Sequence, residues 1–192
     1  MVFAPGERTL AVSGYEMGAA ILDSSSGRVL TGMPVSGGLY TLGVAFSPDG
    51  TKLASTDWNG SLDFWNPKTG ESLGKISDPD LAVGASVSWS PDGRTIALTD
   101  WSNTLRLFDV ATRTEIGSPF QLLVGQPTAD PYAAYTPDGK NVIVSDIYGQ
   151  TWVAPVTLPA WEAEACRVAG RNLTRAEWNE FLPGRPYRRF CP

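Results

Sequence analysis

Short runs of apolar and β-prone residues alternate with polar turns along most of the chain. Each run is bounded by Gly, Pro, Asn or Asp, which is typical of β-strands. Four of the turns are built around a proline, followed either by glycine or by Asp-Gly, and their prolines are Pro5, Pro48, Pro91 and Pro137. Proline presets φ at the second turn position, and Asp-Gly completes the reversal of the chain. The turns therefore predict four strand ends at 43, 43 and 46 residue intervals.

Counted from each proline, the apolar runs align without gaps. They occupy residues 10–13, 53–56, 96–99 and 142–145, and then residues 19–23, 62–66, 105–109 and 151–155. A period in the forties is typical of a propeller blade, a four-stranded sheet that buries its faces against neighbouring blades. The pattern predicts an all-β fold of four four-stranded antiparallel sheets. The predicted blades span residues 1–34, 35–78, 79–124 and 125–156.

The aligned residues resemble the WD-repeat family, with a pattern of the form FSPDG, then LAS, then a tryptophan followed by Asp or Asn and by Thr-Gly. Residues 46–70 meet the pattern best and residues 89–115 meet it well, whereas residues 3–30 and 135–155 meet it loosely. The resemblance covers about four fifths of the chain. It implies a β-propeller used as a non-catalytic protein-interaction or sensing module.

The chain departs from this family in the polar brace that often ties each blade together. The brace joins His, Ser or Thr, Asp and Trp, but this chain has no histidine. Only the second blade keeps the tryptophan, as Trp65, and its Asp position holds Asn59. We therefore expect the brace to be absent, so that packing and backbone hydrogen bonds hold each blade.

Four blades raise the question of how the ring closes, because WD-repeat rings typically have six to eight. Residues Val2 and Phe3 already lie in the first strand of a blade. We expect the chain to form the C-terminal half of the propeller of a larger signalling or regulatory protein. Two alternatives are a homodimer that closes an eight-bladed ring and a compact four-bladed ring. An open half-ring would expose sheet faces and edges, which predicts association.

Residues 157–192 break the repeat and predict a helical tail packed on the propeller. Residues 160–168 contain strong helix formers with an apolar stripe at Trp161, Ala165 and Val168. Thr174 and Glu177 have the spacing of a capping box, which predicts a second helix from Arg175 to Phe181. Together Trp161, Trp178 and Phe181 offer the apolar area for docking.

The tail also resembles a segment that follows WD-repeat propellers in large actinobacterial regulators, including STAND-type ATPases. The resemblance is carried by Trp161-Glu162, Ala165-Cys166, residues 169–174, Glu177-Trp178, residues 182–184, Pro186-Tyr187 and Cys191-Pro192. It implies that any ATPase activity would reside in a different region of such a protein, since this chain has no phosphate-binding loop. It also implies a cytoplasmic location in a bacterium.

The only two cysteines, Cys166 and Cys191, both lie in the tail. They are too few for a zinc site, and no histidine is available to complete one. They either form a disulfide that joins the end of the chain to the first tail helix or remain reduced thiols in a cytosolic protein. No metal or other cofactor is expected.

Charge argues against a nucleic-acid partner. Residues 1–160 contain 9 Lys or Arg against 16 Asp or Glu, whereas residues 161–192 contain 6 Arg against 4 Glu. Contacts to phosphates require a basic face, which an acidic propeller lacks. No apolar run has the length of a membrane helix, and we expect neither a nucleic acid nor a membrane as partner.

The hairpin between the second and third strands of each blade carries the candidate binding residues. The aromatic side chains are Tyr15, Trp58 and Trp101, and the acidic side chains are Asp57, Asp100 and Asp146. In WD-repeat proteins such loops lie on the face most used for binding, and exposed aromatic residues are typical interface anchors. In the alternative interpretation, the aromatic rings wedge between blades and the aspartates cap their own turns.

Catalysis is not expected, because histidine is the commonest general acid–base residue and the chain has none. Two alternatives to an interaction module remain. In one, the propeller is the scaffold of an enzyme that uses Asp57, Asp100 and Asp146 at the channel mouth. In the other, it is a purely architectural oligomerisation element. A protein partner, or the remaining blades of a larger parent, is the expected ligand.

Overall fold

A computed structural model describes residues 1–6, 8–14, 17–34, 40–77, 84–122, 131–181, 184–189 and 191. The chain divides into two compact units, Met1–Ala154 and Pro155–Pro192. The first unit consists of strands and the second contains two helices. The end of the sequence repeat predicted a boundary after residue 156.

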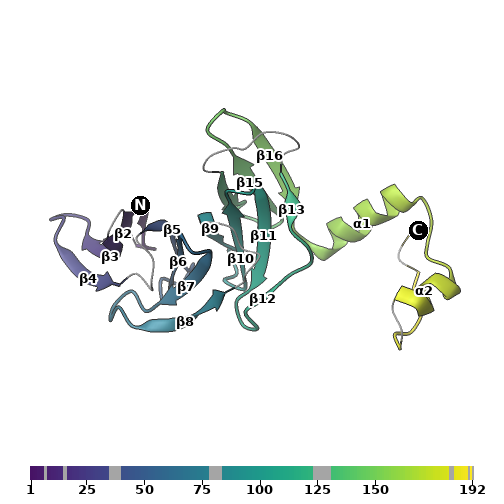
Figure 1. Cartoon of the computed structure of the whole chain (residues 1–192), viewed down its shortest axis with the longest axis horizontal. Helices are drawn as coiled ribbons and strands as arrows, with labels where there is room; N and C mark the ends of the chain where they lie inside the picture. Colours follow the sequence, from purple (N-terminus) through teal and green to yellow (C-terminus); the bar gives the residue numbers. More distant parts are fainter. Residues whose placement is uncertain are drawn as a thin grey trace. The chain divides into compact units, whose positions relative to one another are not determined.

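Four antiparallel sheets follow one another along the first unit, as the sequence predicted (Figure 1). The first sheet contains β1 (Val2–Phe3), β2 (Thr9–Gly14), β3 (Met17–Asp23) and β4 (Val29–Met33). The second contains β5 (Thr41–Phe46), β6 (Leu53–Asp57), β7 (Ser61–Trp65) and β8 (Ser72–Ser77). The third contains β9 (Gly84–Trp89), β10 (Thr95–Asp100), β11 (Thr104–Asp109), β12 (Thr114–Glu115) and β13 (Phe120–Gln121). The fourth contains β14 (Tyr132–Tyr135), β15 (Asn141–Ser145) and β16 (Thr151–Pro155).

The number of strands differs from four in the last two sheets. In the third sheet, β12 and β13 pair with opposite ends of β11 and so share the outer position. The fourth sheet has three described strands, in the order β14-β15-β16. The chain has no second polar turn after β16, because residues 155–159 contain two prolines and lead directly into a helix.

The proline turns are held by the hydrogen bonds that their sequence predicts. In the second sheet, the Ser47 hydroxyl donates to the Asp49 carboxylate at 2.6 Å and accepts from the Lys52 amide at 2.9 Å. Gly50 has a φ of 68°, a conformation that glycine adopts without strain. The hydrogen bond from the Ser47 hydroxyl, followed by those from the Thr51 amide and hydroxyl, lowers the pKa of Asp49 to about 2. The turns are thus rigid local structures.

Consecutive sheets pack through their first strands or, in the first sheet, mainly its second strand: β2 packs against β5, β5 against β9 and β9 against β14. Between the second and third sheets lies an apolar core that includes Phe64, Ile76, Trp89, Leu98 and Phe108. The rings of Phe64 and Trp89 meet edge to face with centroids 6.0 Å apart. Burial of such side chains is worth about 1.5–3 kcal/mol each. Apolar contacts between sheets therefore contribute substantially to the stability of the unit.

The expected absence of the polar brace was wrong in one blade. The indole of Trp65 donates from Nε1 to the Ser55 hydroxyl at 2.8 Å, and both residues are buried. The two side chains lie on directly paired strands, β6 and β7, so the bond needs neither the histidine nor the aspartate. Phe108 and Leu98 occupy the same positions in the third sheet, where the brace is replaced by apolar packing.

The tail contains helices α1 (Leu158–Ala169) and α2 (Arg175–Phe181). Helix α1 begins two residues earlier than predicted, because Pro159 lies in the first turn, where its missing N–H has no helical partner. The predicted capping box is present: the Thr174 amide donates to Glu177 at 2.8 Å, and the Glu177 amide donates to the Thr174 hydroxyl at 3.3 Å.

Trp178 forms the core of the tail unit itself. It is 3% exposed, and its Nε1 donates to the Arg185 carbonyl at 2.9 Å. The Tyr187 ring packs against it edge to face at 5.5 Å, and the Arg175 guanidinium lies 4.9 Å from the Tyr187 ring centroid. On α1, Val168 of the predicted apolar stripe is exposed. Packing of the tail on the propeller remains a prediction.

Candidate functional site

The three candidate aspartates each hold their own hairpin. One carboxylate oxygen of Asp57 accepts from the amides of Asn59 and Ser61, both at 2.9 Å. Asp100 accepts in the same way from the second and fourth residues after it, and also from the Thr104 hydroxyl at 2.6 Å. Asp146 repeats the arrangement in the fourth sheet. All three residues are buried, so they shape the hairpins rather than cover their surface.

The aromatic residues of the same hairpins lie beside one another across the sheets. Trp58 is 44% exposed and Trp101 is 37% exposed, and their rings meet edge to face with centroids 4.9 Å apart. The centroids of the Tyr40 and Trp58 rings are 5.3 Å apart. We call Tyr40, Trp58 and Trp101 the aromatic row. Tyr15, the first of the predicted aromatic residues, lies outside the described residues.

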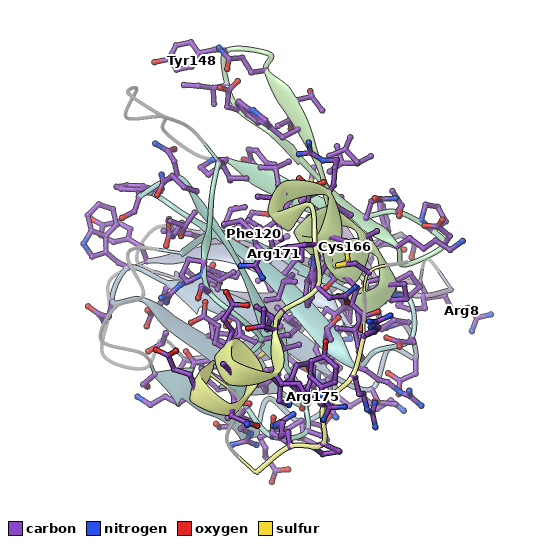
Figure 2. All side chains as sticks on the ribbon, turned by 90° about the vertical axis from the view of Figure 1, so that its right-hand side faces the viewer. Arg8, Phe120, Tyr148, Cys166, Arg171 and Arg175 are labelled. Carbon is purple, nitrogen blue, oxygen red and sulfur yellow. A yellow bond between two sulfur atoms is a disulfide. The ribbon has the colours of Figure 1, made fainter. Side chains whose placement is uncertain are left out.

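The fourth hairpin also presents apolar side chains, though not a tryptophan at the equivalent position. Ile147 replaces the tryptophan and is 56% exposed, and Tyr148 follows it with 68% exposed. Figure 2 shows Tyr148 projecting from the tip of this hairpin. The hairpins of the second, third and fourth sheets thus all carry exposed large apolar residues.

Tyr40 was missed as a candidate because it lies in the connection entering the second blade rather than in the repeated hairpin. Its signal was the position directly before β5, since such connections share a face with the hairpins. The Trp58 amide donates to the Tyr40 carbonyl at 3.2 Å, which joins the hairpin to this connection. Within the aromatic row, Tyr40 and Trp58 are therefore joined by a backbone hydrogen bond as well as by their ring contact.

Behind the hairpin of the second sheet lies a buried carboxyl group. Burial raises the pKa of Asp63 to about 6, and repulsion by Asp57 acts in the same direction, whereas Lys75 opposes it. The second carboxylate oxygen of Asp57 is buried and has no hydrogen-bond partner among the described residues. The equivalent of Asp63 in the third sheet is Arg106, which forms an ion pair with Glu115 at 3.3 Å. Neighbouring sheets thus bury opposite charges at one repeat position.

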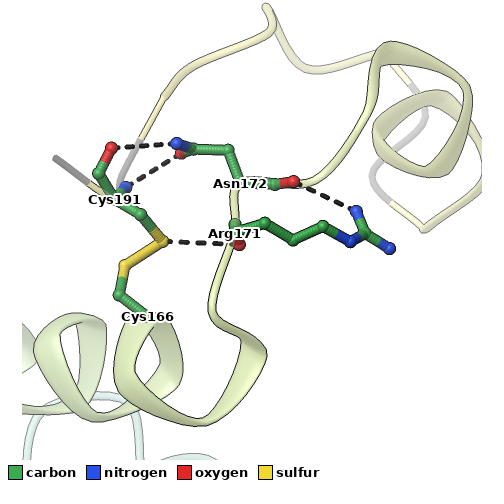
Figure 3. The surroundings of a disulfide bond; sticks show 4 residues. All are labelled: Cys166, Arg171, Asn172 and Cys191. Atoms are coloured by element: carbon green, nitrogen blue, oxygen red, sulfur yellow. Dashed lines mark hydrogen bonds between the residues drawn. A yellow bond between two sulfur atoms is a disulfide. The ribbon is translucent and has the colours of Figure 1, made fainter.

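In the tail, Cys166 of α1 and Cys191 form a disulfide with Cα atoms 5.3 Å apart (Figure 3). The Asn172 side chain binds the Cys191 backbone twice, donating to its carbonyl and accepting from its amide, each at 2.9 Å. Arg171 forms a bidentate ion pair with Glu177. The end of the chain is therefore attached both to α1 and to the segment before α2.

Within the described part of the chain, no three His, Cys, Asp or Glu side chains are grouped so that they could hold a metal ion. None of the described helices is long and apolar enough to cross a membrane.

The comparisons with known proteins agree with the fold. The family model described as "WD domain, G-beta repeat" matches residues 24–66 and 71–109. Each match begins after the third strand of one sheet and ends at or next to the third strand of the following sheet, so one sequence repeat links two neighbouring sheets. The matches support a WD-repeat propeller. No curated protein was found to match the chain.

WD-repeat domains generally mediate protein–protein interactions and are typically not enzymes. Neither match includes the tail. The resemblance of the tail to that of actinobacterial STAND-type regulators therefore stays a prediction.

Proposed function

We propose that this chain is the protein-binding part of a larger bacterial signalling or regulatory protein and that it acts in the cytoplasm. It captures a protein partner through the aromatic row and the adjoining hairpin of the fourth sheet. The observation that carries this proposal is the contact between two exposed tryptophans, Trp58 and Trp101, from neighbouring hairpins. Tryptophan and tyrosine are the residues most enriched at binding hot spots.

The buried aspartates support this role by holding the loops in place. Asp57 and Asp100 each bind two amides of their own hairpin, which limits the conformations of the loops that carry the tryptophans. A loop that is ordered before binding loses less conformational entropy when a partner docks. Further blades, from a larger parent or a second copy, are the proposed partners of the open sheet faces.

The alternative function, an enzyme with carboxylates at the channel mouth, would use the same aspartates. One oxygen of Asp146, as of the other two, is already bound to two backbone amides. This engagement favours a structural role. A purely architectural role would leave the exposed tryptophans without a function, and the experiment below separates it from partner binding.

The test is the double variant Trp58→Ser/Trp101→Ser, with Val29→Ser as the control. Val29 is exposed to a similar degree but lies on the outer strand β4. Affinity capture from the source cells, followed by mass spectrometry, should recover one partner with the wild type and with the control but not with the double variant. The free energy of unfolding should fall by only about 1–3 kcal/mol, from loss of the ring contact and of the partly buried ring surface, and the double variant should stay folded. A double variant that unfolds, or that still captures the partner, would show the proposal to be wrong.

A further inference from the structure

The interfaces between consecutive sheets repeat the same three contacts. The first joins the proline of one turn to the glycine of the next turn, with the proline Cδ 3.5–3.7 Å from the position that a Cβ would take on the glycine. The pairs are Pro5 with Gly50, Pro48 with Gly93, and Pro91 with Gly139. A larger residue than glycine would be strained there, because all three glycines have a positive φ.

The second contact is a hydrogen bond between neighbouring sheets. A hydroxyl at the end of the second strand of one sheet donates to a backbone carbonyl at or just before the first strand of the next sheet. The three bonds run from Ser13 to Leu42 at 3.3 Å, from Thr56 to Gly84 at 3.2 Å, and from Thr99 to Pro131 at 2.5 Å. Each one satisfies a backbone carbonyl at an interface, where an unpaired polar group would be costly.

The third contact is apolar and covers the face that each sheet turns toward the next. In the second sheet this face includes Ala54 and Phe64, which are 0% and 3% exposed. Ala97 and Leu107 occupy the same positions in the third sheet and are equally buried. The apolar side chains on this face are therefore buried wherever another sheet follows.

The fourth sheet presents the same face, and no further sheet packs on it in the described part of the chain. Ile143 is 39% exposed and Val153 is 62% exposed, at the positions of Ala97 and Leu107. By contrast, Val144 on the opposite face is fully buried. We call Tyr132, Ile143, Ser145 and Val153 the trailing face. Ser145 stands at the position of the three hydroxyl donors.

The first sheet presents the complementary half of the same interface. Phe3 is 57% exposed, and Leu10 and Leu22 are half-buried. At the positions of these two leucines the second sheet has Leu53 and Trp65, which are 0% and 5% exposed. We call Phe3, Gly6, Leu10 and Leu22 the leading face. A Cβ on Gly6 would meet nothing within 4 Å, whereas each of its three equivalents has a proline against it.

We propose that the trailing face of one copy of this chain docks on the leading face of a second copy. Both halves of the repeated interface are in this chain: among the described residues Gly6 has open space where its three equivalents have a proline, and Pro137 stands at the position of those three prolines. Ile143 and Val153 supply the apolar surface of one side, and Leu10 and Leu22 that of the other. The contact continues an interface that the chain already forms three times.

Such a head-to-tail contact either closes into a ring or continues into a fibre. Two copies bring eight sheets, which lies within the range of four to eight blades found in propellers. A ring of two copies covers both leading faces and both trailing faces. The occupant is therefore a second copy in a closed dimer. The inference rests on the sheets and not on the aromatic row, so it can fail independently of the proposed function.

The test measures the mass of the full chain in solution by sedimentation equilibrium over a wide concentration range. The wild type should be a dimer, and Ile143→Asp should weaken the dimer by at least about 100-fold, because it buries an unpaired carboxylate in both interfaces. Leu73→Asp is the matched control, since Leu73 is 39% exposed, as Ile143 is, but lies on β8 of the second sheet and on neither the leading nor the trailing face. Circular dichroism establishes that both variants keep their sheets.

A mixing experiment identifies the two faces that meet. Leu10→Lys should weaken the dimer as Ile143→Asp does, but an equimolar mixture of the two variants should dimerise. The mixed ring has one unaltered interface and one in which the lysine can pair with the aspartate. A monomeric wild type, a dimer that Ile143→Asp leaves intact, or a mixture that stays monomeric would each overturn the proposal. The faces would then be covered by the tail or by blades of another polypeptide.

Discussion

We expect the second sheet to keep most of its stability when both residues of its polar brace are replaced by the apolar residues that the third sheet has at the same positions. Replacing only one of the two should destabilise the protein. The pair is Trp65 and Ser55, joined by a 2.8 Å hydrogen bond and each 5% exposed. At the same positions the third sheet has Phe108 and Leu98, which are 1% and 0% exposed. The perturbations are therefore Trp65→Phe, Ser55→Leu and the double variant.

The magnitudes follow from what each variant leaves unpaired. Trp65→Phe leaves the buried Ser55 hydroxyl without its donor, and Ser55→Leu leaves the buried indole N–H without an acceptor. Each should lower the free energy of unfolding by about 1–3 kcal/mol, with a further loss from altered packing. The double variant removes both polar partners and keeps the combined volume similar, so it should cost less than about 1.5 kcal/mol.

The assay is urea unfolding followed by far-UV circular dichroism, with the same m-value required of all four proteins. The double-mutant cycle should give a coupling energy of about 1–3 kcal/mol, within the range measured for residues in contact. A double variant whose loss equals the sum of the two single losses would contradict the reasoning. It would mean that the hydrogen bond contributes nothing and that packing alone decides stability.

Three further predictions concern the tail and the buried carboxyl. Trp178→Ala should lower the free energy of unfolding of the tail by about 3–5 kcal/mol, because it empties the core of that unit; an unchanged thermal melt of the tail helices would contradict this. Replacing Cys166 and Cys191 by serine should destabilise the tail by about 3.5 kcal/mol, as expected for release of a loop of this length, and reduction of the wild type should reproduce the loss. Asp63→Asn should be more stable than the wild type above about pH 6, by roughly 2–3 kcal/mol, and equally stable below the unfolded pKa near 4. Because the folded pKa is raised, the native state binds more protons between these pH values, so the wild type loses stability as pH rises through this window. A difference between the two proteins that does not change with pH would show that the Asp63 carboxyl is not perturbed.

The sheets could be predicted because every repeat carries the same local chemistry. Ser47 and Asp49 close their turn by bonds that span two to five residues, and such bonds follow directly from sequence. The bond between Ser55 and Trp65 could not be predicted in the same way. It depends on which residues of two strands lie opposite one another, and the missing histidine and aspartate of the brace suggested that the rest was missing too.

The candidate site was predicted as a set of positions but not as a surface. The hairpin column contains Trp58 and Trp101, yet their ring contact depends on the rotation between two sheets, which no single repeat specifies. Tyr40 adds a third ring from outside the column. Conversely, Asp57, Asp100 and Asp146 were candidate binding residues because they recur at one repeat position. They recur because each hairpin needs a carboxylate that accepts hydrogen bonds from its backbone amides.

The two proposed surfaces have a common origin in the offset between sequence repeat and sheet. A repeat such as residues 24–66 contributes β4 to one sheet and three strands to the next, so each repeat holds two sheets together. This link sets the rotation that brings Trp58 against Trp101 on the hairpin side. Among the described sheets, the first and the fourth each have one face with no neighbouring sheet against it. A variant that altered the packing between the second and third sheets, such as Phe108→Ala, should therefore disturb the aromatic row as well as the core, even though Phe108 itself is 1% exposed.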